Sequence, residues 1–258
     1  MQKLFKQKLL NLSISAIVIL IFLSIGDSNA QIVRKSKVEF YSADNLLVTA
    51  DHYYSRKDNP YILLFHTEQS SRGEFDVIAE RFIKMQYNCV AVDIRTGNKY
   101  GFVKNETSGR AVDLGVDKQL LDGEKDIRAA LDFVKSLSDK NIILLGSSSS
   151  ASLCLKIAAE ENNINAVIAL SPGEFFQPNF EVRSIFEKYN TPVFIAGNLS
   201  EEPYLIDIFS DLKEEYKTMI SPPDYTLGRG TGLLLAENPT SNEYWFSILI
   251  FIKSLKGK

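Results

Sequence analysis

Histidine and cysteine are scarce in this chain of 258 residues, which contains two of each. No pair of them has the spacing of a metal-binding motif, so the sequence predicts no metal site, and we expect no cofactor. Both cysteines, Cys89 and Cys154, fall in apolar segments. We therefore expect buried thiols, although a disulfide would be permitted outside the cytoplasm.

An excess of basic residues is also missing, because 29 Lys and Arg face 32 Asp and Glu, which gives a net charge of −3. A mildly acidic chain is not expected to bind nucleic acid or anionic lipid as its main partner. No repeat, low-complexity stretch or Pro/Gly linker interrupts residues 31–258. This part is long enough to form one sizeable core, and we expect a single domain there.

The first 30 residues have the pattern of a secretory signal peptide. A lysine-containing start is followed by an apolar, uncharged run at residues 13–25 and by Ser-Asn-Ala at residues 28–30. The apolar run is shorter than the roughly 18 residues of a membrane span, although an uncleaved anchor is the alternative. We therefore expect export to the periplasm or the extracellular space, and no stable membrane insertion after cleavage.

Short apolar runs predict the strands. Two runs joined at residues 43–45 are typical of an antiparallel hairpin, Val38–Tyr41 and Leu46–Tyr54. Five later runs do not alternate with polar residues, which is typical of strands buried on both faces of a parallel sheet. They are Tyr61–Phe65, Cys89–Ile94, Asn141–Gly146, Ala166–Leu170 and Pro192–Ala196.

Apolar residues at helical spacing separate these runs, and the last helix is expected after Thr240, which has capping-box spacing to Glu243. Strands that alternate with helices indicate βαβ units. The sequence thus predicts an α/β fold: a doubly wound, mostly parallel sheet that begins with antiparallel strands.

One segment combines a buried strand, a turn of small residues and a helix. It reads Gly146-Ser147-Ser148-Ser149-Ser150 after the run at residues 141–146. This segment resembles the nucleophile elbow of the α/β-hydrolase superfamily, G-x-S-x-G on a strand-to-helix turn. The resemblance puts Ser148 at the nucleophile position. Ser150 stands where the second glycine is usual, a departure that keeps the residue small.

A second similarity covers residues 63–75, L-L-F-H-T-E-Q-S-S-R-G-E-F. This form resembles the dienelactone-hydrolase-like branch of the superfamily. The resemblance implies an oxyanion hole formed by the backbone N–H of Thr67 or Glu68 and by that of Ser149. It also implies that His66 is a structural residue of this turn.

A third similarity is the D-x-R pattern at Asp93, and it implies that Asp93 organises the loop that follows the strand. The next residues, Arg95–Gly115, are rich in glycine and fit neither a helix nor a strand. We expect a long loop over the carboxyl ends of the strands, where ligands bind in such sheets. A solvated surface excursion is the alternative.

The resemblance further implies an acid and then a histidine after Ser148 in chain order. Glu201 or Glu202 follows the fifth apolar run and would supply the acid. Arg229 occupies the expected histidine position, and both histidines of the chain precede Ser148. Arginine stays protonated near neutral pH, so it cannot act as a general base.

Two functions remain open on this evidence. The first is an exported serine ester hydrolase by descent, acting on an unknown small ester or acyl substrate and impaired by Arg229. An unusual base would rescue it, and His66 is the only imidazole candidate. The second is an inactive pseudohydrolase that binds a small anionic ligand through Arg229, or a protein partner. In the plainest version, Arg229 forms a structural ion pair with Glu201 or Glu202.

Overall fold

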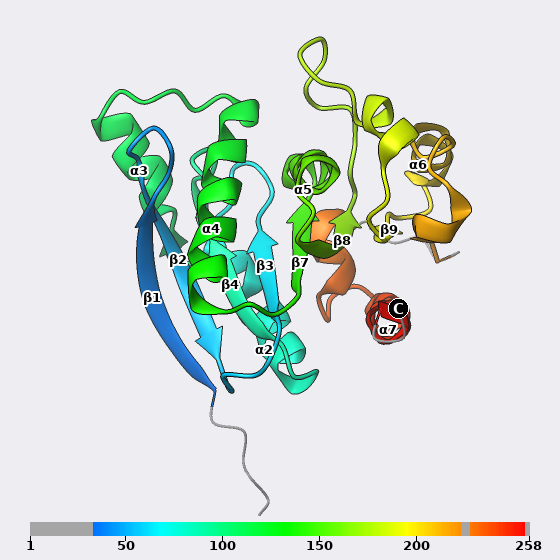
Figure 1. Ribbon diagram of the computed structural model, residues 1–258, viewed down its shortest axis with the longest axis horizontal. Helices are drawn as coiled ribbons and strands as arrows, with labels where there is room; N and C mark the ends of the chain where they lie inside the picture. The colour runs from blue at the N-terminus through cyan, green and yellow to red at the C-terminus, as the bar shows by residue number, and fades with distance from the viewer. Residues whose placement is uncertain (1–32, 223–227, 256–258) are drawn as a thin grey trace, which may run out of the picture. The chain divides into compact units, whose positions relative to one another are not determined.

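The computed structural model describes residues 33–222 and 228–255. The signal peptide expected at residues 1–30 lies outside these residues. The described chain contains an eight-stranded sheet in the order β1-β2-β4-β3-β7-β8-β9-β10 (Figure 1). The strands are β1 (Arg34–Tyr41), β2 (Leu47–Tyr54), β3 (Tyr61–Phe65), β4 (Asn88–Val92), β7 (Ile142–Ser147), β8 (Ile164–Leu170), β9 (Val193–Ala196) and β10 (Lys217–Ile220).

Only the start of the sheet is antiparallel. Strand β1 pairs with β2, and β2 pairs with β4, in antiparallel register, whereas the remaining neighbours are parallel. Each apolar run of the sequence corresponds to one of these strands, with ends that differ by at most a few residues. The predicted α/β fold, a mostly parallel sheet with antiparallel first strands in one domain, is confirmed.

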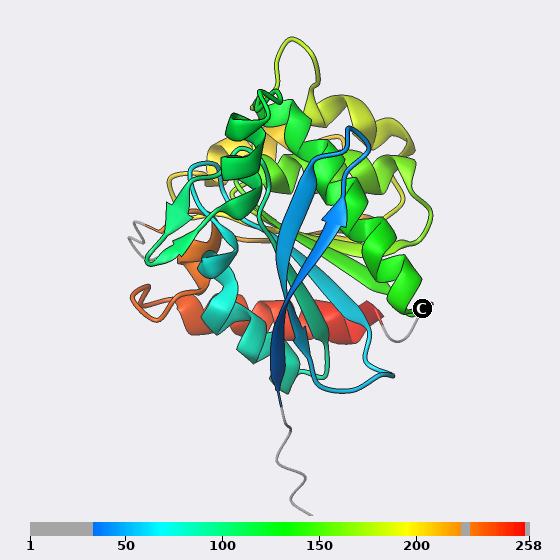
Figure 2. The same ribbon diagram turned by 90° about the vertical axis from the view of Figure 1, so that its left-hand side faces the viewer.

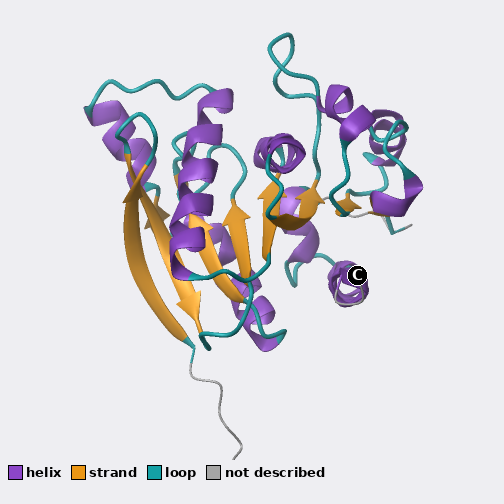
Figure 3. Ribbon diagram, viewed as in Figure 1, coloured by secondary structure: helices purple, strands orange, loops and turns teal. Residues whose placement is uncertain are grey.

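Helices cover both faces of the sheet (Figures 2 and 3). Helices α4 (Gly123–Leu137) and α5 (Ser149–Glu160) share one apolar core with alternate strand residues such as Leu63. Helices α2 (Asp76–Lys84) and α7 (Ser241–Ser254) share the other core with residues such as Leu64. Successive residues of a strand face opposite sides of the sheet, so a strand that is apolar at every position contributes side chains to both cores.

The expectation of a bare loop at Arg95–Gly115 is wrong. This segment contains the short hairpin β5 (Lys99–Tyr100) and β6 (Val103–Lys104), followed by helix α3 (Glu106–Asp113). The α3 helix begins because the side chain of Asn105 accepts a hydrogen bond from the Ser108 N–H at 2.7 Å. Gly109 weakens this eight-residue helix, but the Asn105 cap and the face that α3 buries stabilise it.

The expected capping box of the last helix is also wrong. Thr240 is the N-cap of α7, but its side chain makes no capping hydrogen bond. The Thr240 hydroxyl instead donates to Asn238 Oδ1 at 3.0 Å. The Thr240 hydroxyl therefore forms a hydrogen bond within the preceding turn and not with the first N–H groups of the helix.

Asp93 connects the loops that follow β3 and β4. Its carboxylate accepts the N–H groups of Arg72 at 2.7 Å and Glu106 at 2.8 Å, and it pairs with the Arg72 guanidinium at 2.5 Å. The Asp93 side chain is fully buried, so removal of the guanidinium would leave an uncompensated charge. This cluster fixes the carboxyl end of β4, beside which ligands bind in sheets of this kind.

Cys89 and Cys154 are buried free thiols, as expected. Within residues 33–222 and 228–255, no helix is both long enough and apolar enough to cross a membrane. The same residues contain no group of three or more His, Cys, Asp or Glu side chains that could hold a metal ion.

Candidate active site

The turn between β7 and α5 has the geometry of a nucleophile elbow. Ser148 lies there with φ 58° and ψ −123°, a conformation that costs a non-glycine residue about 1–3 kcal/mol. A Cβ added at Gly146 would lie 2.4 Å from the Cα of Ala151, so the strand and helix approach too closely for any side chain there. The left-handed backbone at Ser148 and the glycine at position 146 together allow the sharp turn between β7 and α5, with Ser148 at its tip.

Ser150, at the position where the resemblance expects glycine, stabilises the elbow through its hydroxyl. Its Oγ lies 2.8 Å from the carbonyl oxygens of Phe65 and His66, and it accepts the Ser147 N–H at 3.1 Å. The side chain is fully buried. The hydroxyl thus joins the carboxyl end of β3 to the turn that carries Ser148.

The side chain of Glu68 faces the elbow. One carboxylate oxygen lies 3.4 Å from Ser148 Oγ, and the other accepts a hydrogen bond from Ser149 Oγ at 2.7 Å. Burial would raise the pKa of Glu68, but hydrogen bonds from Ser149, from its own N–H, from Thr67 and from Ser148 outweigh burial and lower it. The carboxylate is therefore ionised at neutral pH beside the candidate nucleophile.

The backbone groups proposed for an oxyanion hole come from two adjacent segments. Ser149 is the first residue of α5, where N–H groups have no acceptor within the helix. Thr67 and Glu68 directly follow β3 and the buried His66. The Glu68 carboxylate brings these two segments together through its contact with Ser149, so a negative charge already lies beside these donors.

The ring of His66 forms its hydrogen bonds with groups outside the elbow. Its ring is fully buried, with Nδ1 2.7 Å from the Thr67 carbonyl and Nε2 3.0 Å from the Ile94 N–H and 3.1 Å from the Asn105 amide. These partners fit a neutral ring that donates from Nδ1 and accepts at Nε2. Burial lowers the pKa of His66. With both nitrogens engaged, the ring has no free position from which to take a proton from Ser148.

Arg229 pairs with Glu201. Its Nε lies 3.1 Å from Glu201 Oε1, and the arginine side chain is 70% exposed whereas that of Glu201 is 8% exposed. The second carboxylate oxygen of Glu201 accepts the Ser171 hydroxyl at 2.9 Å and the Asn198 N–H at 3.0 Å. Glu202, the other acid considered, is the first residue of α6 (Glu202–Ile208). The structure thus brings Glu201, not Glu202, to Arg229.

The loop that carries Arg229 passes beside the elbow. Gly230 has φ 55°, and a Cβ added there would lie 2.1 Å from Ser147 Oγ and 3.8 Å from Ser148 N. The N–H of Gly230 donates to Ser171 Oγ at 2.8 Å, and the N–H of Thr231 donates to Ser147 Oγ at 3.1 Å. Residue 229 is therefore held close to the elbow by its two successors.

Sequence reasoning missed three side-chain roles in this site: the Glu68 carboxylate at the elbow, the Ser150 hydroxyl, and Ser171, which links Glu201 to the Gly230 N–H. A signal existed only for Ser150, as the one departure from the elbow motif. The other contacts join residues 30 to 81 positions apart, and no spacing rule connects them.

No protein-family model and no curated protein matches this sequence. Several solved structures do match. An esterase of Pyrococcus furiosus is 14% identical with a TM-score of 0.66, over 86% of this chain and 93% of that one. The dienelactone hydrolase of Anabaena variabilis is 13% identical with a TM-score of 0.62, over 85% and 95%.

An acetyl xylan esterase from a Paenibacillus species is also similar, with 14% identity and a TM-score of 0.62 over 87% of this chain and 86% of that one. Identities this low establish the fold but not the reaction. Together with the parallel sheet and the strained serine between β7 and α5, these similarities show that the chain has the α/β-hydrolase fold.

Proposed function

We propose that this chain is an exported serine ester hydrolase by descent, with a site for a small ester or acyl compound at Ser148 and strongly impaired turnover. The observation that carries the proposal is the elbow itself, in which Ser148 is held at φ 58° and ψ −123°. Strain of this kind persists only where the surrounding structure enforces it, and it is concentrated at functional sites.

The chemistry would begin with attack of Ser148 Oγ on the ester carbonyl. The oxyanion would be stabilised by the N–H of Ser149 together with that of Thr67 or Glu68, at about 3 kcal/mol per donor. The proton of Ser148 needs an acceptor, and the Glu68 carboxylate is within hydrogen-bond distance of its hydroxyl at 3.4 Å. A carboxylate with a lowered pKa is a weak base, so this step is slow.

Impairment follows from Arg229. A guanidinium cannot take up the serine proton, and its Nε is already paired with Glu201. Loss of the base from a serine triad lowers kcat by several orders of magnitude, whereas binding and the oxyanion hole leave a residual rate.

Labelling with a fluorophosphonate probe tests the proposal. We compare wild type with Ser148→Ala, Arg229→His and Glu68→Gln, and use Ser136→Ala, an exposed serine of α4, as the matched control. We expect slow labelling of wild type and of the control, none in Ser148→Ala, and labelling at least about 10-fold faster in Arg229→His. Glu68→Gln should label more slowly than wild type if Glu68 accepts the proton.

Two results would contradict this proposal. The first is an absence of labelling in both wild type and Arg229→His, with all proteins folded. The second is labelling of wild type as fast as that of an intact serine hydrolase and unchanged in Arg229→His, because an effective base would then be present.

The alternative is a pseudohydrolase that binds a small anion or a protein partner at this site. The Arg229 side chain supports it, because it is 70% exposed although it pairs with Glu201, so a ligand could reach the guanidinium. The Glu68 carboxylate opposes it, since a fixed negative charge beside Ser148 disfavours a bound anion there, and the same charge also slows formation of the oxyanion in the esterase reaction. Binding of acetate to Ser148→Ala that is lost in Arg229→Gln would favour this alternative.

Export belongs to the proposal as well, on the basis of the signal-peptide pattern of residues 1–30. Mass spectrometry of the protein recovered from a secreting host tests it. A mature chain that begins at Gln31, outside the cytoplasm, is the expected result. An intact N-terminus in the cytoplasmic fraction would contradict export.

A further inference from the structure

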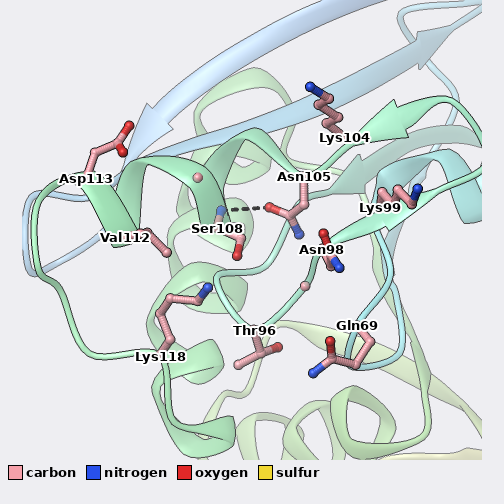
Figure 4. Close-up of a pocket in the computed structure, with 12 residues that line it drawn as sticks. Gln69, Thr96, Asn98, Lys99, Lys104, Asn105, Ser108, Val112, Asp113 and Lys118 are labelled. Carbon is pink, nitrogen blue, oxygen red and sulfur yellow. Dashed lines mark hydrogen bonds between the residues drawn. The ribbon is translucent and has the colours of Figure 1, made fainter.

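A hollow of about 590 Å³ lies next to the candidate active site (Figure 4). It is bounded by the loop after β3, the loop after β4, the β5–β6 hairpin and α3. Gln69 lines it, and this residue directly follows Glu68, which contacts Ser148. The elbow residues and Arg229 do not line it. The hollow is therefore a neighbouring site, of a size typical of small-molecule pockets.

Three lysines from separate segments line this hollow: Lys99 of β5, Lys104 of β6 and Lys118 of the chain that follows α3. None of them forms an ion pair with another residue in the part of the chain that the structure describes. Lys118 is half-buried and extends toward the middle of the hollow in Figure 4, whereas the exposed Lys99 and Lys104 extend outward from its rim. The lining of the hollow is thus richer in cations than the whole chain, which has a net charge of −3.

Acidic groups near the hollow do not neutralise these lysines. Asp113 is the one carboxylate that lines it, and its carboxylate is directed outward from the end of α3 in Figure 4. Glu106, also on α3, is engaged by the guanidinium of Arg72 at 2.8 Å and by Lys37 at 3.0 Å. Three lysines and one carboxylate therefore line the hollow, and the ammonium group of Lys118 is the charge directed into it.

The floor of the hollow is rigid. The amide of Asn105 donates to the Ile94 carbonyl at 2.9 Å, and its oxygen accepts the Ser108 N–H at 2.7 Å. A Cβ at Gly97 would lie 2.1 Å from Asn105 Nδ2, so the loop after β4 is packed directly against this amide. These contacts hold the backbone at the base of the hollow in place, so the hollow does not have to be formed by the ligand.

We propose that this hollow binds a small polyanion, a molecule that carries two or more carboxylate or phosphate groups. Lys118 supplies charge inside the hollow, and Lys99 and Lys104 supply it from the rim through side chains flexible enough to turn toward a ligand. The amides of Gln69 and Asn98 supply neutral donors at the rim. Lysine is a point charge that suits either group, so the chemistry shared by carboxylates and phosphates is what the hollow recognises. The inference does not depend on whether Ser148 reacts.

Isothermal titration calorimetry of the whole protein with citrate and with inorganic pyrophosphate tests this site at low ionic strength. The test variant combines Lys99→Gln, Lys104→Gln and Lys118→Gln. The matched control combines substitutions to glutamine of three exposed lysines that also form no ion pair with described residues, Lys57, Lys140 and Lys188. Both variants change the net charge by the same amount, and circular dichroism verifies their folding.

We expect at least one probe to bind wild type, Ser148→Ala and the control triple variant, and to bind the Lys99/Lys104/Lys118 variant about tenfold or more weakly. Affinity should fall as salt is added. The proposal is overturned if wild type binds neither probe, if both triple variants weaken binding equally, or if Arg229→Gln abolishes binding. The last result would place the anion at the Ser148 site instead.

Discussion

Replacement of Ser150 by alanine removes the hydroxyl that joins β3 to the elbow. Its Oγ lies 2.8 Å from the carbonyl oxygens of Phe65 and His66, and it accepts the Ser147 N–H at 3.1 Å. All of this is buried, so water cannot take the place of the hydroxyl. We expect the free energy of unfolding to fall by about 1–3 kcal/mol, the range for a buried polar group left without its partner.

Urea denaturation followed by circular dichroism measures this change. Ser150→Gly restores the residue that is usual in the elbow motif, yet we expect it to be less stable than Ser150→Ala by up to about 1 kcal/mol, because Ser150 lies within α5 and glycine weakens a helix. Ser136→Ala is the matched control. The Ser136 hydroxyl is exposed and donates to a carbonyl of its own helix, so its loss should change stability by less than about 0.5 kcal/mol.

The reasoning would be refuted if Ser150→Ala were as stable as the Ser136→Ala control. That result would mean that the Ser147 N–H and the two carbonyl groups find other partners when the hydroxyl is removed. A higher free energy of unfolding in Ser150→Gly would refute it more strongly, because the serine side chain would then destabilise the folded protein.

Three further predictions test the surroundings of the site. Gly230→Ala should lower the melting temperature clearly more than Gly101→Ala, because both residues have φ 55° but only at Gly230 would the new Cβ meet an atom, Ser147 Oγ at 2.1 Å; equal effects would contradict the packing of this loop. In NMR titrations the buried ring of His66 should take up its proton at a lower pH than a free histidine, because burial lowers its pKa. The unfolded chain takes up that proton near pH 6.5, so His66 makes the free energy of unfolding decrease as the pH falls below that value, and a ring that titrates at 6.5 or above in the folded protein would oppose this. Burial also raises the pKa of both thiols, so Cys89 and Cys154 should react with a thiol reagent only after unfolding, and rapid reaction of the native protein would contradict their burial.

The central parallel strands could be predicted because burial on both faces leaves a pattern that a single segment carries alone. Tyr61–Phe65, for example, is apolar at every position and is β3 at the same bounds. The last strand, β10, was missed because Lys217–Ile220 is only partly buried and lacks that pattern. Helix α3 was missed because its eight residues include Gly109 and follow other glycines, so local preference favoured a loop. Its formation depends on the Asn105 cap and on the Glu106 N–H donating to Asp93, a contact with another segment.

The elbow could be predicted for a similar reason, since the small residues that its sharp turn requires lie together in one segment, Gly146 to Ser150. The contact of the Glu68 carboxylate with this elbow could not be predicted. Its contacts with Ser148 and Ser149 span 80 and 81 residues, and they depend on the parallel pairing of β3 with β7, which sets Phe65 beside Gly146. The sequence resemblance predicted only that the backbone N–H of Glu68 could be an oxyanion-hole donor. That its side chain also contacts the elbow becomes visible only from the register of the sheet.

Arg229 forms an ion pair with Glu201 at the position where the sequence resemblance expects a histidine. Glu201 is buried and also accepts hydrogen bonds from Ser171 and Asn198, whereas the Arg229 side chain is 70% exposed, so the pair contributes no more than about 1 kcal/mol to stability. A histidine is largely neutral at pH 7, whereas an arginine is always charged. Arg229 therefore compensates Glu201 permanently, but the same permanent charge prevents it from accepting the proton of Ser148. The charge that compensates Glu201 is thus the property that prevents proton uptake at residue 229, and Arg229→His should react faster while its free energy of unfolding falls by no more than about 1 kcal/mol.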